Sequence, residues 1–99
     1  MLEVAILNII SGREDEFEVA FKSAAIIISK MPGYLSHELQ RCLEEKGKYI
    51  LMVHWQTLED HIEGFRKSQE YQEWKHLLHH FYKPFPKVEH YTLVTKSAG

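Results

Sequence analysis

Several features that mark particular protein classes are missing from this sequence. Its 99 residues contain one cysteine, Cys42, which excludes a disulfide framework within the chain and indicates a reducing, cytoplasmic location. The longest apolar runs, such as residues 24–28, are far too short to span a bilayer, and the N-terminal residues lack the marks of a signal peptide. A formal net charge of -2 provides neither a basic surface for nucleic acid nor a polybasic membrane signal. We therefore expect no nucleic-acid partner and no membrane partner.

Sequence signatures of common catalytic machinery are missing too. The chain has 5 scattered glycines, with no glycine-rich phosphate loop and no GxSxG nucleophile motif, so conventional nucleophilic catalysis is not indicated. What the chain does have is an ordinary apolar content of 44%, which predicts a folded domain, and 7 histidines, which is an unusual number for this length.

The predicted elements follow the order β-α-β-β-α-β within a single domain. The core should extend over about residues 2–95 and leave a frayed tail over 96–99. This order is typical of the α+β ferredoxin-like fold with an antiparallel sheet. Apolar periodicity and turn residues predict four strands, over residues 2–10, 34–42, 48–55 and 88–94.

Polar residues at the expected starts of helices predict where the helices begin. Ser11 should be the N-cap of the first helix, with Glu14 in the capping-box position, and that helix should end near residue 30. Thr57 should cap a short helix that breaks near Gly64. Ser68 should then cap a longer helix that continues to about residue 82.

The first and third predicted strands, residues 2–10 and 48–55, carry apolar side chains on both faces. In a β-α-β-β-α-β subunit the helices cover only one face of the sheet, so the other face needs a second partner. A second copy of the same sheet is the simplest partner. We therefore expect a symmetric homodimer that forms through the sheet face.

The histidines divide into two groups by position. His76, His79 and His80 have the i, i+3, i+4 spacing of metal ligands on a helix, but helical phase places them away from the apolar stripe. We expect them at the surface or against a partner, and predict no metal site. His61 shares the inward face of its short helix with Phe65. It is either a packed core histidine or a pocket histidine that binds a ligand and acts as an acid or base.

Three further histidines, His37, His54 and His90, lie on predicted strands, where successive side chains point to opposite faces. His54 and Trp55 must therefore point apart, although the sequence does not decide which face holds a cavity. His37 and His90 are candidate ligand contacts, and the alternative for each is a purely structural role.

Aromatic residues are concentrated in the second half of the chain. Core packing is one interpretation of this run, and a cavity wall for a flat aromatic ligand is the other. If a cavity exists, its candidate ligand contacts are Trp55, Phe65, Tyr71 and Trp74.

Four short motifs give the chain a family resemblance over about residues 2–95. They are Gly12-x-Glu14-x-Glu16-Phe17, Pro32-Gly33, Trp55-x-x-x-Glu59-Asp60-His61 and Phe65-x-x-Ser68. With these motifs the chain resembles the antibiotic biosynthesis monooxygenase domain family, whose members are dimeric α+β barrels. The family includes enzymes that oxidise polycyclic phenols or quinols with O2, often without a metal, flavin or other prosthetic group. It also includes haem-degrading oxygenases and members with no known activity.

The resemblance implies roles for individual residues. In the cofactor-free enzymes a tryptophan on the third strand and a polar aromatic group on the next helix contact the substrate, and Trp55 and His61 match these positions. A polar strand residue of that pattern is replaced here by Leu51. The haem-degrading branch uses an asparagine, a tryptophan and a histidine where this chain has Ala5, Phe65 and Lys75, so haem degradation is not expected.

Together, the residues and the resemblance predict a monooxygenase-like protein without a cofactor that acts on a small hydrophobic, aromatic molecule of phenol or quinol type. His61 would hydrogen-bond or deprotonate the phenolic oxygen, Trp55 and Phe65 would stack on the ring, and Tyr71 and Trp74 would close the cavity. The alternative is a non-catalytic protein on the same fold that binds a small molecule or acts in a stress response. An open pocket with an unpaired ring nitrogen on His61 would favour the enzyme.

Overall fold

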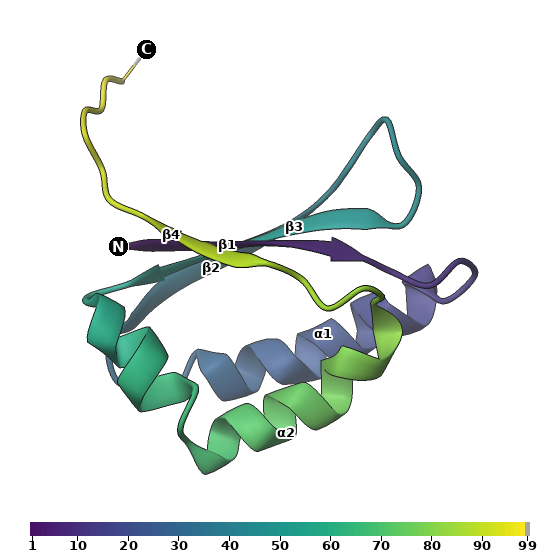
Figure 1. Cartoon of the computed structure of the whole chain (residues 1–99), viewed down its shortest axis with the longest axis horizontal. Coiled ribbons are helices and arrows are strands. Elements are labelled where there is room, and N and C mark those ends of the chain that lie inside the picture. Colours follow the sequence, from purple (N-terminus) through teal and green to yellow (C-terminus); the bar gives the residue numbers. More distant parts are fainter. Residues whose placement is uncertain (99) are drawn as a thin grey trace.

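The computed structural model describes residues 1–98 as a four-stranded sheet with helices on one side (Figure 1). The predicted β-α-β-β-α-β order is confirmed, although the first, second and last strands are shorter than predicted. In chain order the elements are β1 (Leu2–Asn8), α1 (Glu14–Ile28), β2 (Tyr34–Arg41), β3 (Lys48–Trp55), the π-helical segment η1 (Asp60–Phe65), α2 (Gln69–Leu78), the 3₁₀ turn η2 (His79–Phe81) and β4 (Val88–Tyr91).

The strands are antiparallel and lie in the order β2-β3-β1-β4. Helices α1 and α2 lie side by side under one face of this sheet, and among the described residues no helix covers the other face (Figure 1). The α+β ferredoxin-like prediction is therefore confirmed. Strand β1 lies between β3 and β4, and its register places Leu2 opposite His54 and Glu3 opposite His90.

The start of α1 differs from the prediction that Ser11 caps it. The helix begins at Glu14, its N-cap is Arg13, and no side chain makes a capping hydrogen bond. Gly12 has φ +86°, a left-handed conformation that glycine adopts without strain. With the turn at Gly12, Ser11 lies two residues before the N-cap, too early in the chain to cap the free N–H groups of the first helical turn. The N–H of Phe17 donates instead to the carbonyl of Arg13.

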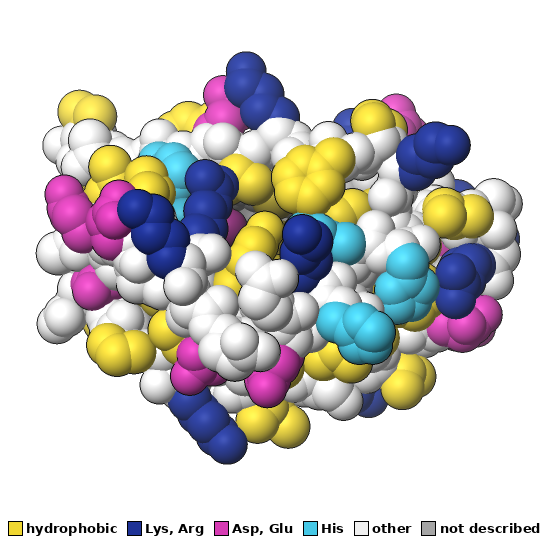
Figure 2. Space-filling view, turned by 60° about the horizontal axis from the view of Figure 1, so that its bottom comes forward, with side chains coloured by type: hydrophobic (Ala, Val, Ile, Leu, Met, Phe, Trp, Pro, Cys, Tyr) yellow, Lys and Arg dark blue, Asp and Glu magenta, His cyan; other side chains and the backbone are white. Residues whose placement is uncertain are grey.

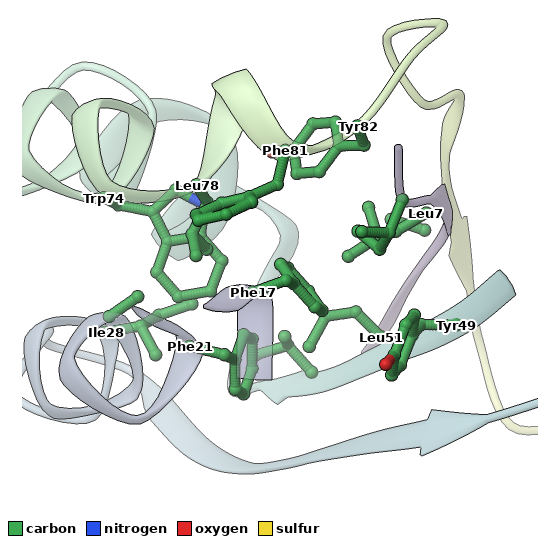
Figure 3. Close-up of a cluster of buried hydrophobic side chains, with 14 of the residues drawn as sticks. Leu7, Phe17, Phe21, Ile28, Tyr49, Leu51, Trp74, Leu78, Phe81 and Tyr82 are labelled. Carbon is green, nitrogen blue, oxygen red and sulfur yellow. The ribbon is translucent and has the colours of Figure 1, made fainter. Parts of the chain in front are cut away.

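The buried face of α1 fixes the helix against the middle of the sheet. Phe17 has no exposed surface, and its ring centroid lies 5.1 Å from that of Tyr49 and 5.9 Å from that of Phe81. Figure 3 shows these rings between the helices and the sheet, with Leu51 and Trp74 in the same cluster. Fully burying one side chain of this size contributes about 1.5–3 kcal/mol. The buried side chains of α1, which recur at helical spacing, thus form its contact with the core.

The short segment after β3 begins with the predicted cap. The N–H and Oγ1 of Thr57 donate to Oδ2 of Asp60, and the N–H of Asp60 donates to Oγ1 of Thr57. The segment that follows, η1, is a π-helix in which the N–H of Arg66 donates to the carbonyl of His61. This wide turn buries both His61 and Phe65 against the sheet. Such turns are frequent at functional sites.

The helical conformation is interrupted after η1, close to Gly64 as predicted. Helix α2 then starts at the predicted cap. Oγ of Ser68 accepts a hydrogen bond from the N–H of Tyr71 at 3.0 Å. The α-helical part ends at Leu78 rather than near residue 82, because the chain tightens into the 3₁₀ turn η2. Within residues 1–98, no helix combines the length and the apolar character that crossing a membrane requires.

The face of the sheet that points away from the helices is apolar as well. Along β1 and β3, the side chains on this face alternate with those buried under the helices. Ile6, for example, is 37% exposed. The apolar residues on this face include Leu2, Val4, Ile6, Ile50 and Met52. The expectation that β1 and β3 carry apolar side chains on both faces is met.

Candidate active site

A cavity of about 310 Å³ lies between the sheet, the segment η1, helix α2 and the chain that leads into β4. Ligand pockets typically measure about 300–1,000 Å³, so this one suits a small molecule. Its aliphatic wall consists of Ala5, Leu7, Ile28, Leu51, Leu78, Pro86 and Val88. Its aromatic wall consists of Phe65, Tyr71, Trp74, Tyr82 and Phe85. Its ionisable groups other than the two tyrosines are Glu3, His61, Arg66 and His79.

Glu3 is a carboxylate buried in the middle of the sheet. Its side chain lies on the helix side of β1 with that of Ala5, and the residue is 7% exposed. Its Oε1 accepts a hydrogen bond from Nε1–H of Trp55 at 2.9 Å and lies 3.3 Å from Nε2 of His61. Burial raises the pKa of Glu3 above its usual value of 4.5, against the smaller lowering effects of the Trp55 hydrogen bond and the Arg66 charge. A carboxylate with such a pKa can exchange protons at higher pH than an ordinary one.

His61 is held between three neighbours at the inner end of the cavity. Its ring stacks on Trp55, with centroids 5.5 Å apart and planes 21° apart. Its Nδ1 lies 2.9 Å from Nε2 of His90, while its Nε2 faces Glu3. Burial lowers the pKa of His61 to about 3, and the charges of Arg66 and His90 act in the same direction, so the ring is neutral at pH 7. One tautomer satisfies both contacts: Nε2–H of His61 faces Glu3, and Nδ1 accepts Nε2–H of His90.

The outer part of the cavity is formed by aromatic and imidazole rings. The ring centroid of His79 lies 5.0 Å from that of Phe85 and 5.4 Å from that of Tyr82. Burial raises the pKa of Tyr71 and of Tyr82, and burial followed by the charge of Lys75 lowers the pKa of His79. Near pH 7 the two phenols are therefore protonated and can donate hydrogen bonds, whereas the imidazole is neutral.

The expectation that His79 faces solvent or a partner is wrong. The residue is half-buried and lines the cavity, because the helix ends just before it and η2 turns it inward. His76 and His80 are exposed, as predicted. Figure 2 shows histidine side chains gathered beside hydrophobic ones on the helix side of the molecule. Across residues 1–98, no group of three or more His, Cys, Asp or Glu side chains is arranged to hold a metal ion.

The predicted ligand contacts fall into two sets. His61, Phe65, Tyr71 and Trp74 line the cavity together. Trp55 is fully buried behind His61 and does not line it.

The two strand histidines among the candidates lie in different places, although both point to the helix side. His90 lies behind His61 and binds its ring nitrogen. His37 lies on β2, where its Nδ1 contacts the hydroxyl of Tyr34 and its ring packs edge-on against Phe21. His37 is outside the cavity lining. As the sequence requires, His54 and Trp55 point to opposite faces.

Sequence reasoning missed two ionisable groups of the cavity lining, Glu3 and Arg66. A signal for Glu3 was present, because it has the same strand parity as the apolar residues Ala5 and Leu7. A charged side chain on the buried face of a strand requires a partner or a function. Arg66 gave no such signal, since its approach to the cavity depends on the π-helical turn before it.

Comparison with known proteins gives one consistent family. The family model for antibiotic biosynthesis monooxygenases matches residues 1–77. An uncharacterized Bacillus subtilis protein, YczJ, is 63% identical over 89 residues, which cover 90% of this chain and 94% of that protein.

Solved structures of this family share the fold. A candidate antibiotic biosynthesis monooxygenase of Bordetella bronchiseptica has a TM-score of 0.90 and 31% identity, with 95% of this chain and 96% of that one covered. SnoaB, a cofactor-independent oxygenase of Streptomyces nogalater, has a TM-score of 0.80 and 16% identity over 97% of this chain and 96% of its own. The chain thus belongs to the antibiotic biosynthesis monooxygenase family.

Proposed function

We propose that this protein is a cofactor-independent, monooxygenase-like enzyme that oxidises a small aromatic molecule of phenol or quinol type with O2. The observation that carries the proposal is a cavity with aromatic walls whose inner end holds the buried pair of Glu3 and His61. An aromatic substrate would pack against Phe65 and Trp74, and its hydroxyl would meet the polar pair. Family membership supports the proposal, as does the shared fold with a cofactor-independent oxygenase.

The proposed reaction balances without a further reductant. A phenol whose para carbon carries hydrogen reacts with O2 to give a quinone and water. Removal of the hydroxyl proton gives a phenolate, whose electrons reduce O2. One oxygen atom ends on the para carbon and the other leaves as water, so the substrate loses four electrons and O2 gains four. The protein would supply orientation, a proton acceptor and a site that excludes water.

We further propose that two copies pair through the bare face of the sheet, as a homodimer in the cytoplasm. The apolar side chains of β1 and β3 on that face support the dimer, since burying apolar surface contributes about 25 cal/mol per Å². The free thiol of Cys42 supports a reducing compartment. Light scattering tests the dimer, and a single species of 11.7 kDa at micromolar concentration would overturn it.

An oxygen-electrode assay tests the enzymatic proposal. Wild-type protein should take up O2 and form quinone in equal amounts with at least one member of a panel of naphthols, anthrone-like phenols and other phenols whose para carbon carries hydrogen. His61→Ala and Trp55→Phe should both lower the rate, because they remove the neighbours of the Glu3 carboxylate. His76→Ala, which changes an exposed histidine on α2, is the matched control and should retain the wild-type rate. Equal rates in all four proteins would refute the site.

One observation favours a second candidate function, the binding of an aromatic molecule without turnover. Both ring nitrogens of His61 already face protein groups, Glu3 and His90, whereas an unpaired nitrogen would favour chemistry on a ligand. A pure binding protein should bind an aromatic alcohol by calorimetry and take up no O2 with any member of the panel.

A further inference from the structure

We infer that Glu3 is the group that receives the hydroxyl proton of the bound aromatic molecule, and that His61 is a positioning residue for the Glu3 carboxylate. This inference rests on the proposed function and names the proton acceptor within the same site. It also defines the ligand: an apolar ring system with a hydroxyl group at the end that enters the cavity first.

The two carboxylate oxygens of Glu3 have different surroundings. Oε1 accepts from Nε1–H of Trp55 and lies 3.3 Å from Nε2 of His61. Oε2 has no protein partner among residues 1–98. In this part of the chain no fully buried side-chain oxygen is without a hydrogen-bond partner, so Oε2 retains accessible surface. Because Glu3 lines the cavity, we assign that surface to the cavity. Trp55 and His61 hold one oxygen, and this orients the other toward a ligand.

His61 is less suited to receive the proton. Its Nδ1 is hydrogen-bonded to His90 and its Nε2 lies 3.3 Å from Oε1 of Glu3, so a ligand at either nitrogen would compete with a protein contact. Burial also disfavours an imidazolium at this position, whereas it makes the Glu3 carboxylate more basic. Efficient proton transfer needs an acceptor whose pKa approaches that of the donor, and this favours Glu3 over His61.

Proton transfer to Glu3 also conserves the charge of the cavity. The phenolic O–H bond breaks, the proton binds Oε2, and the electron pair remains on the phenolate oxygen. One negative charge is present before and after this step, and the Arg66 side chain in the cavity lining can stabilise it on either group. The proton is returned when O2 is reduced to water, which leaves Glu3 ionised for the next turnover. Transfer to His61 would instead place a new positive charge on a buried ring.

A binding experiment under nitrogen tests the Glu3 contact without turnover. The probes are 1-naphthol and its methyl ether, which differ in the hydroxyl proton. Because a hydrogen bond to a buried carboxylate requires that proton, the wild-type protein should bind naphthol at least about tenfold more tightly than the ether. Glu3→Gln, which keeps an acceptor for Trp55, should lose most of this preference, whereas Glu63→Gln on the exposed side of η1 should keep it. Equal wild-type affinity for both probes would overturn the inference.

Oxygen uptake then tests proton transfer. Glu3→Gln should lower kcat by about 10²- to 10⁴-fold, and Glu3→Asp, which withdraws the carboxylate by one methylene, should lower it at least tenfold. His61→Phe keeps the stack on Trp55 but removes one of the two polar neighbours of Oε1. It should therefore shift the rising limb of the pH–rate profile to higher pH, an effect that a merely structural residue would not cause.

The outcomes separate the two proposals. Wild-type activity that Glu3→Gln does not change would refute the role of Glu3 and leave the oxygenase function standing. No O2 uptake by the wild-type protein, together with a naphthol preference that Glu3→Gln abolishes, would refute oxidation and leave the hydroxyl contact of Glu3 standing.

Discussion

Burial of His61 makes the stability of this protein depend on pH in a predictable way. The folded chain holds His61 with a pKa lowered from 6.5 to about 3. Below pH 6.5 the unfolded chain therefore binds a proton that the folded chain does not, and the free energy of unfolding falls as the pH falls. The loss begins near pH 6.5 and continues toward pH 3. Glu3 acts in the opposite direction, because its raised pKa stabilises the fold at low pH, and this contribution is lost as the pH rises through its folded-state pKa.

Comparison with His61→Gln isolates the histidine, because Glu3 is present in both proteins. For each pH unit below 6.5, the protonation of His61 in the unfolded chain lowers the free energy of unfolding by about 1.4 kcal/mol. His61 should therefore lower the stability of the wild-type protein by about 2 kcal/mol between pH 6.5 and 5. The glutamine variant lacks this titration. Urea unfolding at fixed protein concentration, followed by tryptophan fluorescence at pH 7.5, 6.5 and 5, measures the difference. We expect the stability advantage of the wild-type protein over the variant to shrink by about 2 kcal/mol over this range.

A control variant tests whether the pH dependence of stability comes from the burial of His61. His76→Gln removes a histidine that is exposed in the folded chain, and its stability should vary with pH as the wild type does. Parallel stability curves for wild type and His61→Gln between pH 7.5 and 5 would show that the folded chain accommodates a charged His61. That result would contradict the reasoning, and it would also remove one reason for assigning proton transfer to Glu3.

Three further predictions concern the turn beside Asp60, the cap of α2 and the aromatic wall of the cavity. Gly33→Ala should destabilise the fold by more than 1 kcal/mol in thermal unfolding, because residue 33 has φ +83° and an added Cβ would overlap the Asp60 carboxylate; Gly12→Ala, with open space around it, should cost less. Ser68→Ala should cost about 1 kcal/mol by removing the cap of α2. Phe85→Ala should leave the melting temperature within a few degrees but weaken binding of 1-naphthol, because this ring is 65% exposed at the cavity; an unchanged Kd would place the ligand elsewhere.

Local signals in the sequence were sufficient for most of the fold. The apolar side chains on both faces of β1 and β3 and the caps at Thr57 and Ser68 are signals that depend on residues close in sequence. The cap predicted at Ser11 failed because the left-handed turn at Gly12 intervenes, and glycine is compatible with several local conformations. The end of α2 was also misjudged, since a change from α-helical to 3₁₀ hydrogen bonding leaves little trace in periodicity.

The candidate site was harder to predict because it depends on contacts across the sheet. Helical phase and the family motif both selected His61, and the structure places it in the cavity. Neither signal could show that His90 binds one ring nitrogen of His61. The two residues are far apart in sequence, and they come together only because β4 pairs with β1 beside η1. His79 was assigned to the surface for a related reason, since its direction depends on the 3₁₀ turn.

Strand parity contains the information that would have located Glu3. On β1, the side chains of Leu2, Val4 and Ile6 point away from the helices. Those of Glu3, Ala5 and Leu7 point toward them. A carboxylate at an inward position loses its hydration, a cost of several kcal/mol unless hydrogen bonds and charges replace it. The structure provides Trp55, His61 and Arg66 as replacements, yet leaves Oε2 without a partner within residues 1–98. A carboxylate retained only for packing would have both oxygens satisfied by the protein, so the open oxygen is the reason to seek a ligand at Glu3.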